Sequence, residues 1–128
     1  MNNKSEFRNH FAETIFRYKY AQGAADTWAK LSDRLVEDVC GSRNGTTPIL
    51  MSDSERKELA EHIKAMRFLP GGRYLYYAGR PYKAYNNCYL LRAEEDTREE
   101  WSAATWRAMC CLMTGGGNGI DHSRLRPE

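Results

Sequence analysis

A thiol and two amides lie together in the sequence Asn86-Asn87-Cys88-Tyr89, within a segment rich in aromatic and branched residues. If this segment is a strand, Asn87 points away from the face of Cys88 unless the strand bulges. An accessible thiolate can take part in redox exchange, whereas a free cysteine is also among the most commonly buried residue types. The pattern alone leaves Cys88 open as a redox thiol or a packing residue.

Glycines 115–117 and Gly119 form the second candidate site. Consecutive glycines let a backbone approach a ligand closely and expose N–H groups to anions. The run follows a predicted helix and opens a predicted strand, which is the reverse of a dinucleotide fingerprint, and no Gly-Lys-Ser/Thr phosphate loop is present. A helix C-cap followed by a tight turn explains the same glycines without a ligand.

The other cysteines and the histidines do not suggest a metal site. Cys40, Cys110 and Cys111 are irregularly spaced, there is no C-x-x-C pair, and the histidines are far apart in the sequence. We therefore expect no metal and no disulfide scaffold. Neighbours on a helix project about 100° apart, so Cys110 and Cys111 are predicted to be packing residues.

The composition excludes several classes of protein. The chain has 128 residues, of which 41% are hydrophobic and 28% charged, and a formal net charge of +2. These values are typical of a soluble globular chain and give little reason to expect direct nucleic-acid binding or base stacking by the tyrosines. No segment approaches the ~20 apolar residues of a membrane span, and the N-terminus lacks a secretory signal, so we expect a cytoplasmic protein.

The first half of the chain is predicted to be helical. Apolar residues at three- and four-residue steps predict one helix over 5–20 and another from Trp28 to Val39, capped by Asp26 or Thr27. Ser52 and Glu55 form a capping-box pattern before a third helix, and 41–51 is predicted to be a loop. The apolar stripes are Phe7, Phe11, Ile15 and Tyr18 in the first helix and Leu59, Ile63 and Met66 in the third.

The second half changes character after residues 69–72. We predict a strand over 85–91, a helix from a second capping box at Thr97 and Glu100 to Gly115, and a short strand over 119–123. Strand, helix and strand in this order indicate a parallel pair. The predicted buried face of the helix comprises Trp101, Ala104, Thr105, Ala108, Cys111 and Leu112.

Taken together, six ordered motifs between residues 66 and 127 resemble the N-terminal part of a ribonucleotide reductase, most closely the adenosylcobalamin-dependent class II enzymes. The motifs are FLPGGRYL (68–75), AGRP (78–81), NNC (86–88), LRAEEDTRE (91–99), MTGGG (113–117) and SRLRP (123–127). The resemblance implies an α/β fold with a mainly α-helical N-terminal part. Its strands would be the opening strands of a ten-stranded α/β barrel.

The resemblance also implies roles for individual residues. Cys88 corresponds to the first cysteine of the pair that reduces the ribonucleotide, and Asn87 to a residue that touches the ribose. Gly116 and Gly117 correspond to glycines against which the substrate lies, and Arg73 to a residue that approaches phosphate. Adenosylcobalamin is the implied cofactor, with a dithiol such as thioredoxin as reductant. Ribonucleoside diphosphates and triphosphates both remain open as substrates.

The chain departs from the family pattern by ending at Glu128. It has no counterpart of the radical-bearing cysteine or of the second reducing cysteine. We therefore expect an N-terminal piece of a reductase, inactive alone, whose remainder is a second polypeptide or a spliced continuation and binds most of the cobalamin. The expected organisation is a helical region over 1–70 and the start of the barrel over 71–128. The alternative is a non-catalytic nucleotide-binding or interaction module derived from the reductase N-terminus.

Overall fold

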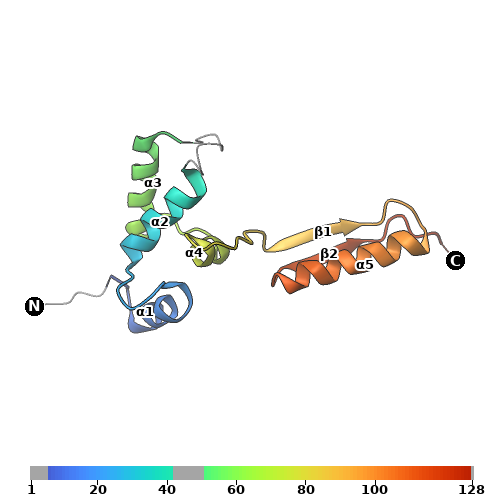
Figure 1. Ribbon diagram of the computed structural model, residues 1–128, viewed down its shortest axis with the longest axis horizontal. Coiled ribbons are helices and arrows are strands. Elements are labelled where there is room, and N and C mark those ends of the chain that lie inside the picture. Colours follow the sequence, from blue (N-terminus) through green and yellow to red (C-terminus); the bar gives the residue numbers. More distant parts are fainter. Residues whose placement is uncertain (1–5, 42–50, 128) are drawn as a thin grey trace, which may run out of the picture. The chain divides into compact units, whose positions relative to one another are not determined.

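The computed structural model describes residues 6–41 and 51–127, so most of the loop predicted over 41–51 lies outside the described residues. The fold is mixed α/β, with two compact units over 1–83 and 84–128. Among the described residues, the elements of the first unit are all helices, and those of the second are two strands and one helix (Figure 1). Across the described ranges, no helix has the length and apolar character that a membrane span requires.

The first unit packs its helices around one apolar core. Its elements are α1 (His10–Ile15), the π-helix η1 (Phe16–Tyr20), α2 (Trp28–Cys40), α3 (Asp53–Lys64) and α4 (Gly72–Tyr77). Helix α2 lies against α3, and the indole Nε1 of Trp28 donates a buried hydrogen bond of 3.0 Å to the carbonyl oxygen of Ile63. The buried core comprises Phe16, Trp28, Leu31, Leu35, Val36, Ala60, Ile63, Leu75 and Ala78.

Local capping determines where α2 and α3 begin. The Thr27 hydroxyl accepts a hydrogen bond from the backbone N–H of Lys30, which confirms Thr27 as the cap of α2. At α3, Ser52 and Glu55 each accept a hydrogen bond from the other's backbone N–H, so the predicted capping box is confirmed. Helix α3 ends at Lys64, so Met66, at φ 54°, lies beyond the helix instead of continuing its stripe.

The prediction for the first helix was wrong in its length and in its buried face. Helix α1 has six residues, and η1 follows with the wider i to i+5 hydrogen bonding of a π-helix, as from Ala21 N to Phe16 O at 2.9 Å. At this wider turn a different side of the helix faces the core, and Phe16 is buried. Phe11 and Tyr18 of the predicted stripe are 74% and 91% exposed.

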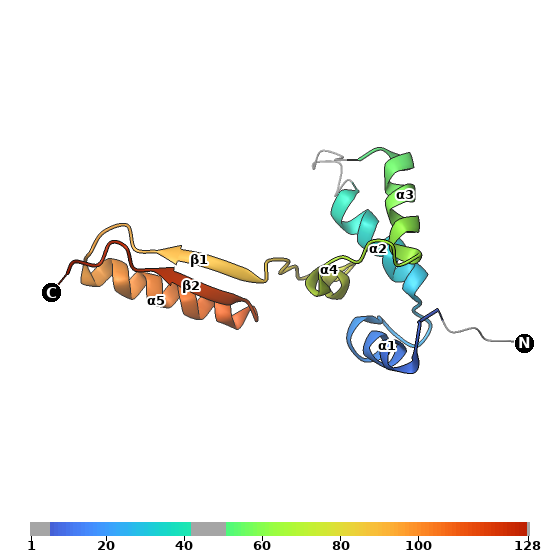
Figure 2. The same ribbon diagram turned by 180° about the vertical axis from the view of Figure 1, so that it is seen from behind.

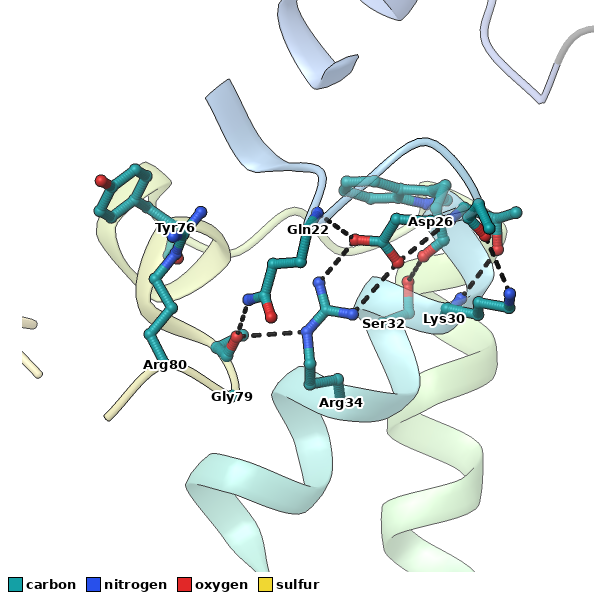
Figure 3. A network of polar contacts seen from close by, with 12 residues as sticks. Gln22, Asp26, Lys30, Ser32, Arg34, Tyr76, Gly79 and Arg80 are labelled. Atoms are coloured by element: carbon teal, nitrogen blue, oxygen red, sulfur yellow. Dashed lines mark hydrogen bonds and ion pairs between the residues drawn. The ribbon is translucent and has the colours of Figure 1, made fainter. Parts of the chain in front are cut away.

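A buried carboxylate organises the segment between η1 and α2. The side chain of Asp26 is 4% exposed and pairs with Arg34 at 2.9 Å, and it also accepts a 2.7 Å hydrogen bond from the Gln22 N–H (Figure 3). Burial acts to raise the pKa of Asp26, but the hydrogen bonds from Arg34 and Gln22 and the charge of Arg34 outweigh it. The net pKa therefore lies below the ordinary value of 3.8.

The same two partners of Asp26 hold the chain that leaves α4. Gln22 Nε2 and Arg34 Nε both donate to the carbonyl oxygen of Ala78, at 2.6 and 3.2 Å. Gly79 follows at φ +73°, and a Cβ there would lie 2.4 Å from Arg34 Cδ. Because Leu75 and Ala78 are buried in the helical core, α4 belongs to the first unit. The boundary between the units is thus Lys83/Ala84, later than the expected boundary at residue 70.

The second unit is a parallel βαβ element, as predicted from the order of its segments. Strand β1 (Cys88–Arg92) pairs with β2 (Gly117–Asp121) in parallel, with Cys88 opposite Gly117, and α5 (Arg98–Met113) connects them. Figures 1 and 2 show α5 along one side of the strand pair. Strand β1 begins three residues later than predicted. Strand β2 begins two residues earlier than predicted, within the glycine run.

Alternation along β1 separates a packed face from an open one. Tyr89 and Leu91 are partly buried on the side of α5, where Ala104 and Ala108 are buried, whereas Cys88 and Leu90 are exposed. Two other residues of the predicted helix face, Thr105 and Leu112, are exposed. Thr97 caps α5 as predicted.

The second half of the predicted capping box at α5, in which the Glu100 carboxylate would accept a hydrogen bond from the Thr97 N–H, does not form. The Glu100 carboxylate accepts from the Glu94 N–H at 3.3 Å, because the acidic loop before the helix folds back over its first turn.

Replacing Asp26 with Asn should destabilise the first unit, because Arg34 would lose its buried charged partner. We expect the free energy of unfolding at pH 7, measured by urea denaturation, to fall by about 2 kcal/mol. Asp33→Asn is the matched control on α2, since Asp33 is 59% exposed in its pair with Lys64 and should contribute under about 1 kcal/mol.

The difference between these two variants should also depend on pH. A carboxylate with a lowered folded pKa stabilises the fold above its unfolded pKa and loses that contribution as the pH falls through the folded value. The gap should therefore shrink below about pH 4. Equal destabilisation by both substitutions at pH 7 would contradict this role of Asp26.

Candidate functional site

Three predicted site residues meet where β1 and β2 begin. Cys88 and Gly117 are directly paired, and the Gly117 N–H donates a 2.8 Å hydrogen bond to the carbonyl oxygen of Asn87. A Cβ placed on Gly117 would lie 3.7 Å from Cys88 Sγ, so the thiol lies beside the glycine backbone. Cys88 is exposed on the face of the strand pair opposite α5. The thiol is therefore accessible to a ligand or to another thiol.

The end of α5 determines how the chain enters this site. Gly115 has φ 76°, and its N–H donates to Leu112 O at 2.8 Å, while the Gly116 N–H donates to Cys111 O at 3.2 Å. This pair of hydrogen bonds is a Schellman motif, in which a glycine in the left-handed conformation ends the helix. The helix C-cap explanation is thus confirmed for Gly115, and the next two glycines lead directly into β2.

Gly116 and Gly117 lie in different environments although they are adjacent. Gly116 is buried, and a Cβ there would lie 2.6 Å from Cε2 of Tyr89, so packing of this ring explains the glycine. Gly117 is exposed, and so is Gly119, whose added Cβ would meet nothing within 4 Å. Gly116 is therefore a packing position under Tyr89, whereas the exposed backbone beside Cys88 is that of Gly117.

The open face forms a strip that we call the glycine strip, made of Cys88, Leu90, Gly117 and Gly119. Leu90 is 82% exposed, and the side chain of Asn118 turns to the other face, where its Nδ2 donates to Ala108 O at 3.3 Å. Gly119 belongs to the glycine run already named as a candidate from the sequence, whereas Leu90 was not assigned to a site. The two-residue period of paired strands, counted from Cys88 and Gly117, identifies both.

The other residues singled out from the sequence are not members of the glycine strip. Asn87 is exposed immediately before β1 and contributes its carbonyl oxygen to the strand pairing. Arg73 is half-buried in α4, within the first unit. Cys40, Cys110 and Cys111 are free thiols of intermediate burial, which leaves Cys88 as the one exposed cysteine of the four.

The two depressions found on the helical unit are too small for adenosylcobalamin. Depressions of about 330 Å³ between α2 and α3 and about 470 Å³ on α1 and η1 match drug-sized ligands, whereas a corrin with its nucleotide arms is far larger. Within 6–41 and 51–127, no group of three or more His, Cys, Asp or Glu side chains could hold a metal ion.

Gly116→Ala should destabilise the second unit, because the new methyl group would overlap the Tyr89 ring. We expect a loss of about 1–3 kcal/mol in the free energy of unfolding of this unit, measured by hydrogen exchange of α5 and β1 amides. Gly119→Ala is the control and should be neutral or slightly stabilising, since alanine costs less backbone entropy than glycine. Equal effects of the two substitutions would show that the Tyr89 contact is unimportant.

Cys88 should be the first cysteine to react in the folded chain, because it alone is exposed. Brief treatment with N-ethylmaleimide followed by peptide mass spectrometry should find Cys88 modified before the other three cysteines. In guanidinium chloride this order should disappear, since unfolding exposes all four thiols. Earlier modification of Cys110 or Cys111 under native conditions would contradict the position of Cys88 on the open face.

Comparison of the chain with models of known protein families, with curated proteins and with solved structures finds no match.

Proposed function

We propose that this chain is the N-terminal part of a ribonucleotide reductase, in which Cys88 is one of the two cysteines that reduce the substrate. One observation carries the proposal: Cys88 is exposed beside a bare glycine backbone on the face of the strand pair that α5 does not cover. A reducing thiol must reach both the ribose and a second thiol, and this position leaves room for both. The order of the six sequence motifs supports the same assignment.

In this reaction two thiols become one disulfide while the ribose loses its 2′ hydroxyl as water. The two thiols supply two electrons and two protons, and the products are a deoxyribonucleotide, water and the disulfide. Cys88 supplies one thiol, and a cysteine of the remainder of the enzyme supplies the other. A dithiol such as thioredoxin then restores both thiols by disulfide exchange, which requires a thiol that a second protein can reach.

The outer edges and the open face of the strand pair support the barrel proposal. Both outer edges of the pair offer backbone N–H and C=O groups to further strands, and the face with Leu90 is exposed. A second chain, or a spliced continuation, that supplies the other barrel strands would cover this face. That remainder would also carry the radical cysteine and bind adenosylcobalamin.

The glycine strip supports a nucleotide as the ligand. Without side chains at Gly117 and Gly119, a sugar can approach the backbone next to Cys88. Asn87 adjoins the same position, and Gly116 acts in this proposal through packing under Tyr89. The proposal takes in both ribonucleoside diphosphates and triphosphates as substrates, and it assigns the reaction to the cytoplasm.

A second candidate function is a non-catalytic nucleotide-binding or interaction module. The first unit favours it, since its helices surround a core of their own that is held by the Asp26 network. In such a module Cys88 would be replaceable without consequence, whereas the reductase proposal makes it essential for repeated turnover.

The test combines this chain with a polypeptide that supplies the rest of a class II barrel, adenosylcobalamin, a ribonucleotide and reduced thioredoxin. We expect deoxyribonucleotide formed over many turnovers, at background level with Cys88→Ser and at full rate with the matched control Cys110→Ser. Full multiple turnover with Cys88→Ser would refute the redox role. Nucleotide binding by this chain alone, with no deoxyribonucleotide from the mixture, would favour the module.

A further inference from the structure

One carboxylate joins three segments of the second unit at the end of the strands opposite Cys88. Asp96, in the loop between β1 and α5, accepts a 2.8 Å hydrogen bond from Nε1 of Trp101 in α5. Its other oxygen contacts Arg126, beyond β2, through the backbone N–H at 3.1 Å and through Nε at 2.8 Å. The Asp96 side chain is 18% exposed and that of Arg126 is 77% exposed, so water screens the ion pair itself. The hydrogen bonds from Trp101 Nε1 and from the Arg126 N–H add two further contacts to the same carboxylate.

A ring contact strengthens the same junction. His122, the first residue after β2, stacks on Trp101 with ring centroids 5.3 Å apart and ring planes 12° from parallel. Between His122 and Arg126 the chain turns, and the Leu125 N–H donates to His122 O at 2.9 Å. The segment that leaves β2 is therefore folded back against the first turns of α5.

The contacts also act on the charge of Asp96. The hydrogen bond from Trp101 lowers the pKa of Asp96 most, followed by the N–H of Arg126, while desolvation opposes them and the Arg126 charge adds to them. The carboxylate is thus held in its ionised form, which is the form that binds Arg126 most strongly.

Strand β2 needs such an anchor because its own sequence specifies its register weakly. Parallel strands are not joined by a tight hairpin that would fix their alignment. Two of the five residues of β2 are glycines, which offer no side chain to hold the pairing and weaken a strand. A slip of one residue would exchange the two faces of the strand. Asn118 would then replace Gly117 opposite Cys88.

We propose that Asp96, Trp101, His122 and Arg126 form a clasp that fixes the register of β2 on β1 and thereby keeps Gly117 opposite Cys88. The Schellman motif at Gly115 anchors one end of β2, and the clasp anchors the other. This inference concerns the register of the strands and stands independently of the proposed function.

The register can be measured in the full chain with Gly117→Cys, because directly paired residues lie within the distance that a disulfide spans. Under mild oxidation, the introduced thiol should form a disulfide with Cys88 rapidly. Adding Asp96→Asn or Arg126→Gln should slow this reaction about fivefold or more, since each removes a charge-assisted contact. Glu95→Gln and Arg124→Gln, which change neighbouring charges outside the clasp, should leave the rate unchanged.

Hydrogen exchange of α5 separates a register effect from general unfolding. We expect α5 amides to stay protected in Arg126→Gln, which keeps the hydrogen bond between Asp96 and Trp101, while β2 amides exchange faster. An unchanged disulfide rate in both clasp variants would overturn the proposal. Loss of α5 protection in both would also overturn it, because the clasp would then hold the whole unit and not specifically the register of β2.

Discussion

The parallel pairing of β1 with β2 is the constraint on which the candidate site depends. It places Cys88 opposite Gly117, although 28 residues separate them in the sequence, and it assigns each neighbouring side chain to one of two faces. On the face of α5, Tyr89 packs over Gly116, where an added Cβ would overlap the ring. On the other face the thiol, Leu90 and two glycines are exposed. The chemistry proposed for Cys88 follows from this division of faces.

Features that arise between residues close in the sequence were predicted well. The Ser52–Glu55 capping box and the Thr27 and Thr97 caps join groups three residues apart, so residue type and spacing are sufficient to identify them. The helix end at Gly115 is equally local, since a left-handed glycine and two short-range hydrogen bonds define it. The βαβ order followed from these boundaries, and the pairing of the strands followed from the order.

Features that depend on distant contacts were predicted poorly. The stripe through Phe11 and Tyr18 had helical spacing, but the π-helix after Ile15 brings Phe16 to the core, and spacing alone does not indicate a π-helix. The role of Gly116 depends on a ring 27 residues earlier, and the Asp96 clasp on an arginine 30 residues later. The reductase proposal takes its family from the ordered motifs, and it takes the role of Cys88 from the exposed position of this thiol beside Gly117.

The most direct test of the account is the chemical state of Cys88 after one round of reaction. This chain, assembled with the remaining barrel segment and adenosylcobalamin, would be given a ribonucleotide without any external reductant and then quenched with a thiol-trapping reagent. The account predicts that mass spectrometry finds Cys88 in a disulfide with a cysteine of the remaining segment, in proportion to the deoxyribonucleotide formed. Deoxyribonucleotide formed while Cys88 stays a free thiol would contradict it.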